Sequence, residues 1–554
     1  QPSATPPPVQ ATSLDSHSAL THRRPQIPKP SPATTMARRA PFTNLDPATA
    51  ADLQSKGFDP HELDQATEQL LAYICIKLIP DFPFPATERL TVLPSSSDGV
   101  DRISRLPRAL LRNILSRLPV TDAARTTVLS SRWRTIWLSA HPVLVDSYLR
   151  HGDYVWPPTP ANSAAITADV SRILDAHPGP FSRVHLVCSH MNAYRPQLAR
   201  WLQLLAAKGV QDLVLVNRPW PCDVPLPDAL FTVNTLVRLY IGLWKLPDTA
   251  SLGSYRTFPH LRELGFCNVV MEQGDIDAIV ARCPVLEVLS IQGGHKGLRL
   301  RIVSQSLRCV QICSSLVEDI AVAKAPCLER LILHGCRDMA GGVSSFKVRI
   351  LDAPKLHAFG FLEPANHVLN IGDTIVRARM KESTTAILTS VKILSLNVRF
   401  GIRSEAEMVP VFLKCFPNVK RLHIISAKCN QSTGTLNLKF KEVPFEIAMP
   451  GISEMYFHEF RGDEGEVAFL KSVFKSAAVL EKAVIMMANP SFTPFSTDET
   501  VSKLRNASEV SRAPSRVVAL ESKGPEGGKP WSFQKGTDFA SEDPFLEAEI
   551  VGKA

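Results

Sequence analysis

The stretch PHLRELGFCNVVMEQGDIDAIVARCPVLEVLSIQ, residues 259–292, contains two copies of one short pattern of apolar residues. The copies are Leu261-Leu264-Phe266 and Leu286-Leu289-Ile291. In each copy the last two apolar residues are two positions apart, as are side chains on one face of a β-strand. The residues between the copies have the i, i+3, i+4, i+7 spacing of a helix, at Ile276, Ile279, Val280 and Cys283. The stretch therefore predicts a strand, a helix and a second strand.

The same pattern recurs along most of the chain. Its first positions, 21 to 35 residues apart, are Val210, Leu236, Leu261, Leu286, Leu307, Leu328, Leu356, Val391, Val419 and Ile452. Most of these spacings fall in or near the range of about 20 to 29 residues that is typical of leucine-rich repeats. Prolines that end the preceding segment stand two residues before five copies, at Pro259, Pro284, Pro326, Pro354 and Pro417. We therefore predict an α/β fold, with a solenoid of parallel strands and helices over residues 160–430.

The predicted solenoid departs from the regular repeat in one respect. Leucine-rich repeats favour Asn or Cys three residues after the last apolar position of the pattern. Cys336 alone meets this requirement, whereas Gly294 and Ala427 occupy the equivalent place in other copies. We therefore expect an irregular arc.

The composition of the 554 residues bounds the function without deciding it. The chain has 45% hydrophobic and 21% charged residues, and with its length this predicts two to four folded units. Its net charge is +9, but it contains no lysine-rich arm that would indicate binding to nucleic acid. The chain has eleven cysteines, an odd number, and no CxxC pair. We therefore expect reduced thiols in an intracellular protein. No apolar run is long enough to predict a membrane span. Because no catalytic or metal-ligand motif occurs, we expect neither a cofactor nor a metal site.

Residues 101–140, DRISRLPRALLRNILSRLPVTDAARTTVLSSRWRTIWLSA, form a dense helical box before the repeats. Two helices are predicted, one following Pro107 and one carrying Trp133 and Trp137. A segment this short is expected to leave apolar surface for a partner. Eight arginines and two aspartates give it a charge of 8 − 2 = +6, which suits an acidic partner.

The box closely resembles the plant F-box motif. The residues that carry the resemblance are Leu106-Pro107, Ile114-Leu115-Ser116-Arg117-Leu118-Pro119 and Val128-Leu129-Ser130-Ser131-Arg132-Trp133-Arg134, followed by Trp137. The resemblance implies a small helical bundle that docks on a Skp-type adaptor and, through it, on a cullin. By this resemblance the adaptor contacts are expected to be Leu106, Pro107, Ile114, Leu118, Pro119, Val128, Leu129 and Trp133. For Ile114 and Leu129 a role in the bundle core is an equal alternative, whereas contact is favoured for Pro107 and Trp133.

A second resemblance lies after the repeats. Ile452 to Phe460, Arg461-Gly462 and Glu466 to Glu481 resemble the FBD module of plant F-box/leucine-rich-repeat proteins. The predicted organisation is then a disordered or partly helical extension (1–99), the F-box (100–148), the solenoid (160–430), an FBD-like strand–helix unit that caps the solenoid (440–489) and a flexible tail (490–554). Met36 is a candidate initiator.

Together these features predict the substrate-recruiting adaptor of a Skp–cullin–F-box (SCF) ubiquitin ligase. The F-box would bind the adaptor and the repeats would bind a target protein that the sequence does not identify; neither nucleic acid nor membrane is an expected partner. The chain is expected to be non-catalytic and to reside in the nucleus, the cytoplasm or both. Two alternatives stay open: a receptor in which the solenoid binds a small molecule, with scattered anion-binding candidates at Arg299, Arg301, Arg349 and Arg399, and a scaffold that joins no ligase.

Overall fold

The computed structural model describes residues 45–77, 102–149, 163–428 and 451–546, with short gaps inside these ranges. The candidate initiator Met36 and most of the predicted N-terminal extension lie outside the described residues. Within the extension, α1 (Pro47–Ser55) and α2 (Pro60–Lys77) confirm that part of it is helical.

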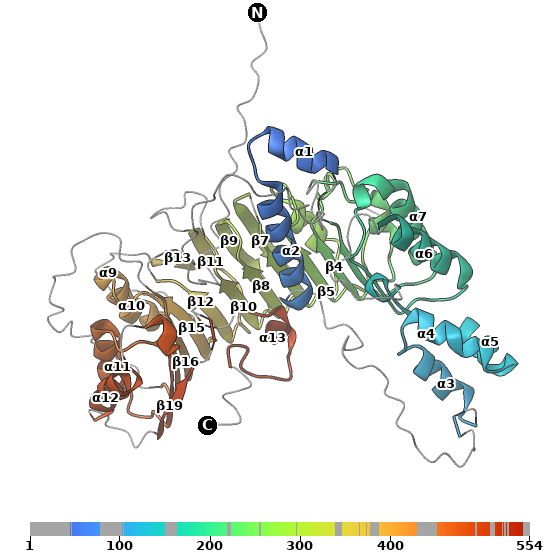
Figure 1. Cartoon of the computed structure of the whole chain (residues 1–554). Coiled ribbons are helices and arrows are strands. Elements are labelled where there is room, and N and C mark those ends of the chain that lie inside the picture. Colours follow the sequence, from blue (N-terminus) through green and yellow to red (C-terminus); the bar gives the residue numbers. More distant parts are fainter. Residues whose placement is uncertain are drawn as a thin grey trace, which may run out of the picture.

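A large parallel sheet runs through the molecule and contains every predicted repeat (Figure 1). Each of the ten predicted patterns forms a strand that begins two residues after its first apolar position. In order across the sheet, the strands are β1 (Val143–Val145), β2 (Arg183–Leu186), β3 (Asp212–Val216), β4 (Arg238–Gly242), β5 (Glu263–Cys267), β6 (Val288–Gln292), β8 (Cys309–Cys313), β10 (Arg330–His334), β12 (Ala358–Leu362), β15 (Ile393–Val398), β16 (Arg421–Ser426), β17 (Glu454–Phe460), β18 (Lys482–Met487) and β19 (Arg516–Glu521). The predicted solenoid is confirmed, and it extends two strands beyond the predicted repeats at each end.

The returns between the strands are of two kinds. Toward both ends of the arc, helices cover the sheet: α6 (Ser163–Ala176), α7 (Arg195–Ala207), α8 (Asp275–Val280), α9 (Arg403–Ala406), α10 (Met408–Lys414) and α11 (Glu464–Ser476). In the middle of the arc the returns form a second sheet of β7 (Leu298–Val303), β9 (Val317–Lys324), β11 (Phe346–Ile350), β13 (His367–Ile371) and β14 (Thr374–Val376). Of the five prolines that stand two residues before a repeat, only Pro284 and Pro417 directly follow a described helix, whereas Pro326 and Pro354 follow strands. The two repeats of 21 residues hold β7 and β9, whereas β11 lies in a repeat of 28 residues and β13 in one of 35, so repeat length alone does not decide the kind of return.

The core lies between the large sheet and these returns. Strand residues that point to the core are aligned from repeat to repeat, since Leu264 pairs with Leu289 and Leu289 with Val310. All three are at most 1% exposed. The opposite face of the large sheet, which carries Tyr240, Gln311, Arg330 and His423, is here called the inner face.

The C-terminal end of the solenoid corrects two predictions. The strand–helix unit of β17 and α11 is present, but β18, α12 (Thr497–Ser508) and β19 continue the architecture after it, so this unit is not the end of the sheet. The predicted flexible tail over residues 490–554 is wrong for its described part. That part also holds α13 (Phe533–Thr537) and the buried side chains of Trp531 and Phe545. Its local composition did not reveal this, because the surface that buries these rings belongs to distant strands.

A substitution in the aligned core tests this architecture. Leu394→Ala in β15 removes a side chain that is 0% exposed, so we expect the free energy of unfolding to fall by ~2–5 kcal/mol through lost burial and the cavity left behind. Leu351→Ala, at a side chain that is 59% exposed, is the control and should change it by less than ~0.5 kcal/mol. Urea unfolding followed by circular dichroism measures both. Equal midpoints for the two variants would contradict the assigned core.

Glu466 at the start of α11 makes the stability of this end depend on pH. Its carboxylate accepts hydrogen bonds from the Ser426 hydroxyl and from the backbone N–H groups of Arg461, Gly462 and Asp463. Burial nevertheless raises its pKa from 4.5 to about 7. The folded protein then binds the proton more tightly than the unfolded chain does, so this contribution to stability is present below about pH 4.5 and is lost as the pH rises to about 7.

We therefore expect Glu466→Gln to flatten the decline in unfolding free energy between pH 5 and pH 7.5. The side chain of Gln is neutral at both values, so it removes the proton uptake linked to folding. Urea unfolding at the two pH values, with the wild-type chain beside the variant, measures the difference. An unchanged pH slope in the variant would show that Glu466 is not the group responsible.

Candidate functional site: an apolar surface on the helical box

Three short helices and a 3-10 turn build the helical box. They are α3 (Arg108–Leu115), α4 (Val120–Arg125), η1 (Thr126–Val128) and α5 (Ser131–Leu138). Prolines in extended conformation precede α3 and α4, at Pro107 and Pro119, where the absence of an N–H costs no helical hydrogen bond. The small core of the box consists of Leu111, Leu115, Ala123, Trp133, Ile136 and Ala140.

Several large apolar side chains of the box are exposed to solvent. Val128 is 83% exposed and Leu129 65%, side by side at the end of η1. On α3, Ile114 is 38% and Leu110 52% exposed, four residues apart and hence on one face of the helix. Exposed apolar side chains gathered in so small a unit indicate a surface that binds another protein.

Seven of the eight predicted contact residues divide into two groups. Pro107, Ile114, Val128 and Leu129 are exposed and available to a partner. Leu106 and Leu118 are half-buried against the core of the box, and Pro119 is half-buried beside the solenoid, where it forms a bridge with Val143.

Trp133 is the exception among the predicted contacts. Its ring is 4% exposed and lies in the core between α3 and α5, so in this structure Trp133 belongs with the core residues of the box and not with its exposed side chains. The packing of α3 on α5 closes over the indole, and the box buries more of its own apolar surface than its length suggested.

Leu110, Ile103 and Leu138 are exposed apolar residues that the sequence analysis did not select. Leu110 carried a signal, because it precedes Ile114 by one helical turn on the side of α3 away from Leu111 and Leu115. The pattern of the whole helix, rather than the family motif alone, would have identified it.

The apolar surface has a cationic border. The exposed arginines of the box are Arg102, Arg105, Arg108, Arg112, Arg117, Arg125 and Arg134. Arg132 is half-buried and donates a hydrogen bond of 2.6 Å to the carbonyl oxygen of Leu106, which fixes the entry to α3 against the start of α5. The surface therefore combines exposed aliphatic side chains with positive charge, and it suits an acidic protein.

The box is joined firmly to the first strands of the solenoid. The ring of His177 lies edge-on to that of Trp137 at 4.5 Å, and its Nε2 atom is 3.0 Å from the Trp137 carbonyl oxygen. Burial lowers the pKa of His177, which keeps the imidazole neutral near pH 7. These contacts hold the box at the end of the sheet and leave its exposed apolar side chains free of the repeats.

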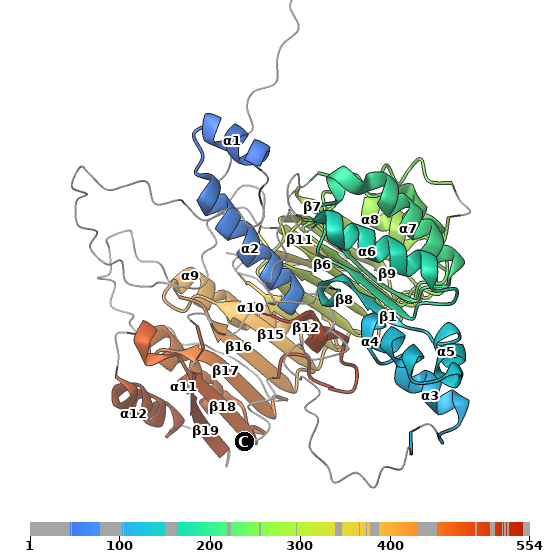
Figure 2. The same ribbon diagram turned by 45° about the vertical axis from the view of Figure 1, so that its right-hand side comes forward.

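The inner face of the sheet is the second candidate surface, and two segments cover it (Figure 2). Ile74 of α2 and Phe533 of α13 line one small pocket together with Tyr240 and Gly265. Farther along the arc, residues 531–546 contact strands from β8 to β17. The sequence carries a signal that this segment is buried, namely four aromatic residues within sixteen positions of a tail otherwise rich in Gly and Pro. They are Trp531, Phe533, Phe539 and Phe545.

The described residues contain neither a metal site nor a membrane-spanning helix. No three His, Cys, Asp or Glu side chains within those ranges lie where they could hold a metal ion. No helix among them combines the length and the apolar character needed to cross a bilayer. Cys309 is fully buried in β8, and burial raises its thiol pKa to about 12.

Comparisons with known proteins agree with this architecture. Residues 103–143 match the F-box domain model, and residues 198–424 match the model described as FBD-associated F-box protein At5g56370, LRR repeats. These two matches show that an F-box domain is followed by leucine-rich repeats in this chain.

The chain is similar to several Arabidopsis thaliana proteins that are named for an F-box and leucine-rich repeats, some of them also for an FBD. F-box/FBD/LRR-repeat protein At1g51370 is 25% identical over 69% of this chain and 88% of its own length. F-box/LRR-repeat protein At3g26922 is 28% identical over 53% of this chain and 89% of its own length. The similarity to F-box/FBD/LRR-repeat protein At1g13570, 28% identical, spans 35% of this chain and 44% of that protein. The predicted resemblance to plant F-box/FBD/leucine-rich-repeat proteins is confirmed.

Substitutions at a buried and an exposed residue of the box test the two groups of side chains. Trp133→Ala should destabilise the box by ~3–5 kcal/mol, because it empties the center of a small core. Val128→Ala should leave its stability nearly unchanged, because the side chain is 83% exposed. Hydrogen exchange of the α3 and α5 backbone amides measures this local stability. Similar exchange rates in the two variants would contradict the assignment of Trp133 to the core.

Proposed function

We propose that this protein is the substrate-recruiting adaptor of an SCF ubiquitin ligase. In this proposal the F-box binds a Skp-type adaptor, which links it to a cullin, and the repeats bind the protein to be modified. Ubiquitin transfer is then the chemistry of partner subunits, and this chain supplies proximity and orientation. The F-box and repeat matches support the proposal, as does the separation of the two surfaces in the structure.

The observation that carries the proposal is the exposure of Val128 and Leu129 beside arginine-rich helices. Fully burying one such side chain stabilises a complex by ~1.5–3 kcal/mol, so two adjacent ones supply a substantial part of a specific interface. The surrounding arginines favour an acidic adaptor and accelerate its association. Leu110 and Ile114 extend the apolar surface along α3.

The same proposal includes a nuclear or cytoplasmic location. The eight described cysteines are thiols, and seven of them are buried. Burial raises the pKa of Cys283 to about 12, so the thiol remains protonated and unreactive. Such cysteines support a compartment in which thiols stay reduced.

No observation in the structure favours the small-molecule receptor. Three of its candidate anion-binding residues are already paired with carboxylates: Arg299 with Glu318, Arg349 with Asp319 and Arg399 with Glu405. Arg299 and Arg301 lie on β7, in the smaller sheet rather than on the inner face. They therefore do not converge on one site.

Capture of a Skp-type adaptor tests the proposal and separates it from the scaffold alternative. The full chain should retain a purified Skp-type adaptor, and the variant Val128→Asp/Leu129→Asp should retain at least ten times less, because it places charge in the buried part of the interface. The matched control is Val303→Asp/Leu351→Asp, which alters an exposed valine and an exposed leucine of the repeats (44% and 59% exposed). Quantitative pull-down and calorimetry measure the difference.

Either of two results would overturn the proposal. The first is no association between the wild-type chain and any Skp-type protein. The second is equal binding by the F-box variant and the repeat control, which would place the contact elsewhere on the chain.

A further inference from the structure

Residues 531–546 lie on the inner face of the large sheet as one continuous segment, WSFQKGTDFASEDPFL. At both ends it places an aromatic ring beside Phe361. The ring centroids of Phe361 and Trp531 are 5.4 Å apart, and those of Phe361 and Phe545 are 5.1 Å apart, each pair edge to face. Gly360 makes room for this contact, since a Cβ atom there would lie 3.0 Å from the Phe545 ring.

The middle of the segment is held mainly by its backbone. Gln311 of β8 donates a hydrogen bond of 3.1 Å to the Phe533 carbonyl oxygen and accepts one of 3.0 Å from the Trp531 indole. Arg330 of β10 donates to the carbonyl oxygens of Gly536, Asp538 and Ser541. Backbone carbonyls occur in every peptide, so the contacts of Gln311 and Arg330 with these carbonyl oxygens do not depend on the sequence of the bound segment, whereas the contact of Gln311 with the indole requires a tryptophan.

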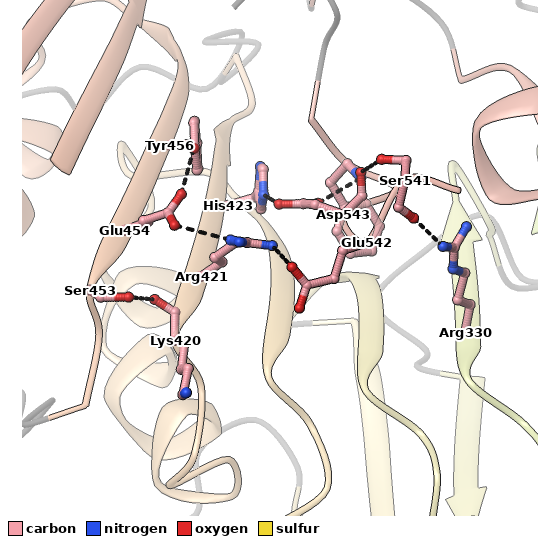
Figure 3. A network of polar contacts seen from close by, with 11 residues as sticks. Arg330, Lys420, Arg421, His423, Ser453, Glu454, Tyr456, Ser541, Glu542 and Asp543 are labelled. Atoms are coloured by element: carbon pink, nitrogen blue, oxygen red, sulfur yellow. Dashed lines mark hydrogen bonds and ion pairs between the residues drawn. The ribbon is translucent and has the colours of Figure 1, made fainter. Parts of the chain in front are cut away.

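The acidic part of the segment meets a cationic group and an imidazole group on one further strand, β16 (Figure 3). Glu542 pairs with Arg421 at 2.8 Å, and Asp543 lies 2.9 Å from the Nε2 atom of His423. Burial acts to raise the pKa of Asp543, but His423 and Arg421 outweigh it and the pKa is lowered, so the carboxylate is charged near neutral pH. These contacts favour an acidic pair just before the second aromatic residue.

The two faces of the same strands are built differently. The core face carries apolar residues throughout, whereas the inner face carries Ser290, Gln311, Arg330, Ser395 and His423, all at most 2% exposed. Strands that are permanently buried on both faces usually read as continuous apolar runs. A row of polar side chains under a covering segment is instead suited to a face that also exists in water, because each group regains hydrogen bonds when the cover leaves.

We propose that the inner face between β8 and β17 is a groove for a linear peptide with two aromatic side chains and an acidic pair, and that residues 531–546 are its internal competitor. A target segment of this chemistry would displace the chain's own segment and take over the contacts of Gln311, Arg330, Phe361 and His423. The identity of that peptide as a degradation target rests on the proposed function; the groove itself does not.

The test is the binding of a fluorescent peptide with the sequence of residues 531–546 to the full-length chain. In the wild type the groove is occupied, so binding should be weak. In Trp531→Ala/Phe545→Ala the internal segment loses both aromatic anchors, and the added peptide should bind at least ten times more tightly. Ala540→Ser, at an exposed position of the same segment, is the matched control and should behave as the wild type. Fluorescence anisotropy measures the affinities. A peptide that carries the same two substitutions, Trp531→Ala and Phe545→Ala, should not bind.

Equal affinity of the peptide for the wild type and the double variant would overturn the proposal, as would no binding to either. A second measurement does not depend on the folding of any variant. Excess ¹⁵N-labelled peptide should accelerate hydrogen exchange at residues 531–546 of the wild-type chain, and an unchanged rate would show that the segment is a fixed structural element.

Capture of the Skp-type adaptor in parallel keeps the two proposals apart. The double variant should retain the adaptor fully, because its substitutions lie far from the helical box. If the wild-type chain does not bind the adaptor, the proposed function is refuted but the groove proposal is unaffected. If the groove does not bind the peptide, only the present inference is refuted.

Discussion

The parallel pairing of one strand position with the same position of the next repeat is the constraint on which the structure depends. Leu289 lies between Leu264 and Val310, and Leu331 between Val310 and Phe359, so that each repeat places the same apolar side chain over its neighbour. A shift by one residue would turn every core side chain of that strand to the opposite face. The register therefore fixes both the core and the chemistry of the inner face.

What covers the core differs along the arc. Helices such as α8 close the repeats toward both ends, and strands of the second sheet close those in the middle. Both solutions shield the same side of the large sheet. The inner face is left for other segments, and the chain covers it with α2 and with residues 531–546.

This arrangement separates two binding surfaces in space. The apolar side chains around Val128 belong to a box with its own small core, fixed to the first strands through Trp137 and His177. The polar and aromatic groups around Arg330 and His423 lie on strands farther along the arc. A partner at one surface leaves the other accessible, which is the geometry that an adaptor between two proteins requires.

The sequence by itself determined the repeats and the helical box. Ten apolar patterns became ten strands, and the box is helical as expected, because both rest on periodic burial within short segments. The second predicted helix of the box is divided into α4, η1 and α5. The sequence did not determine that the Trp133 ring is buried, because its burial depends on how closely α3 packs on α5. Only the tertiary structure decided the place of the C-terminal segment. The rings of Trp531 and Phe545 are buried by residues more than 150 positions earlier, such as Phe361, and a local pattern carries no information about such a distant surface.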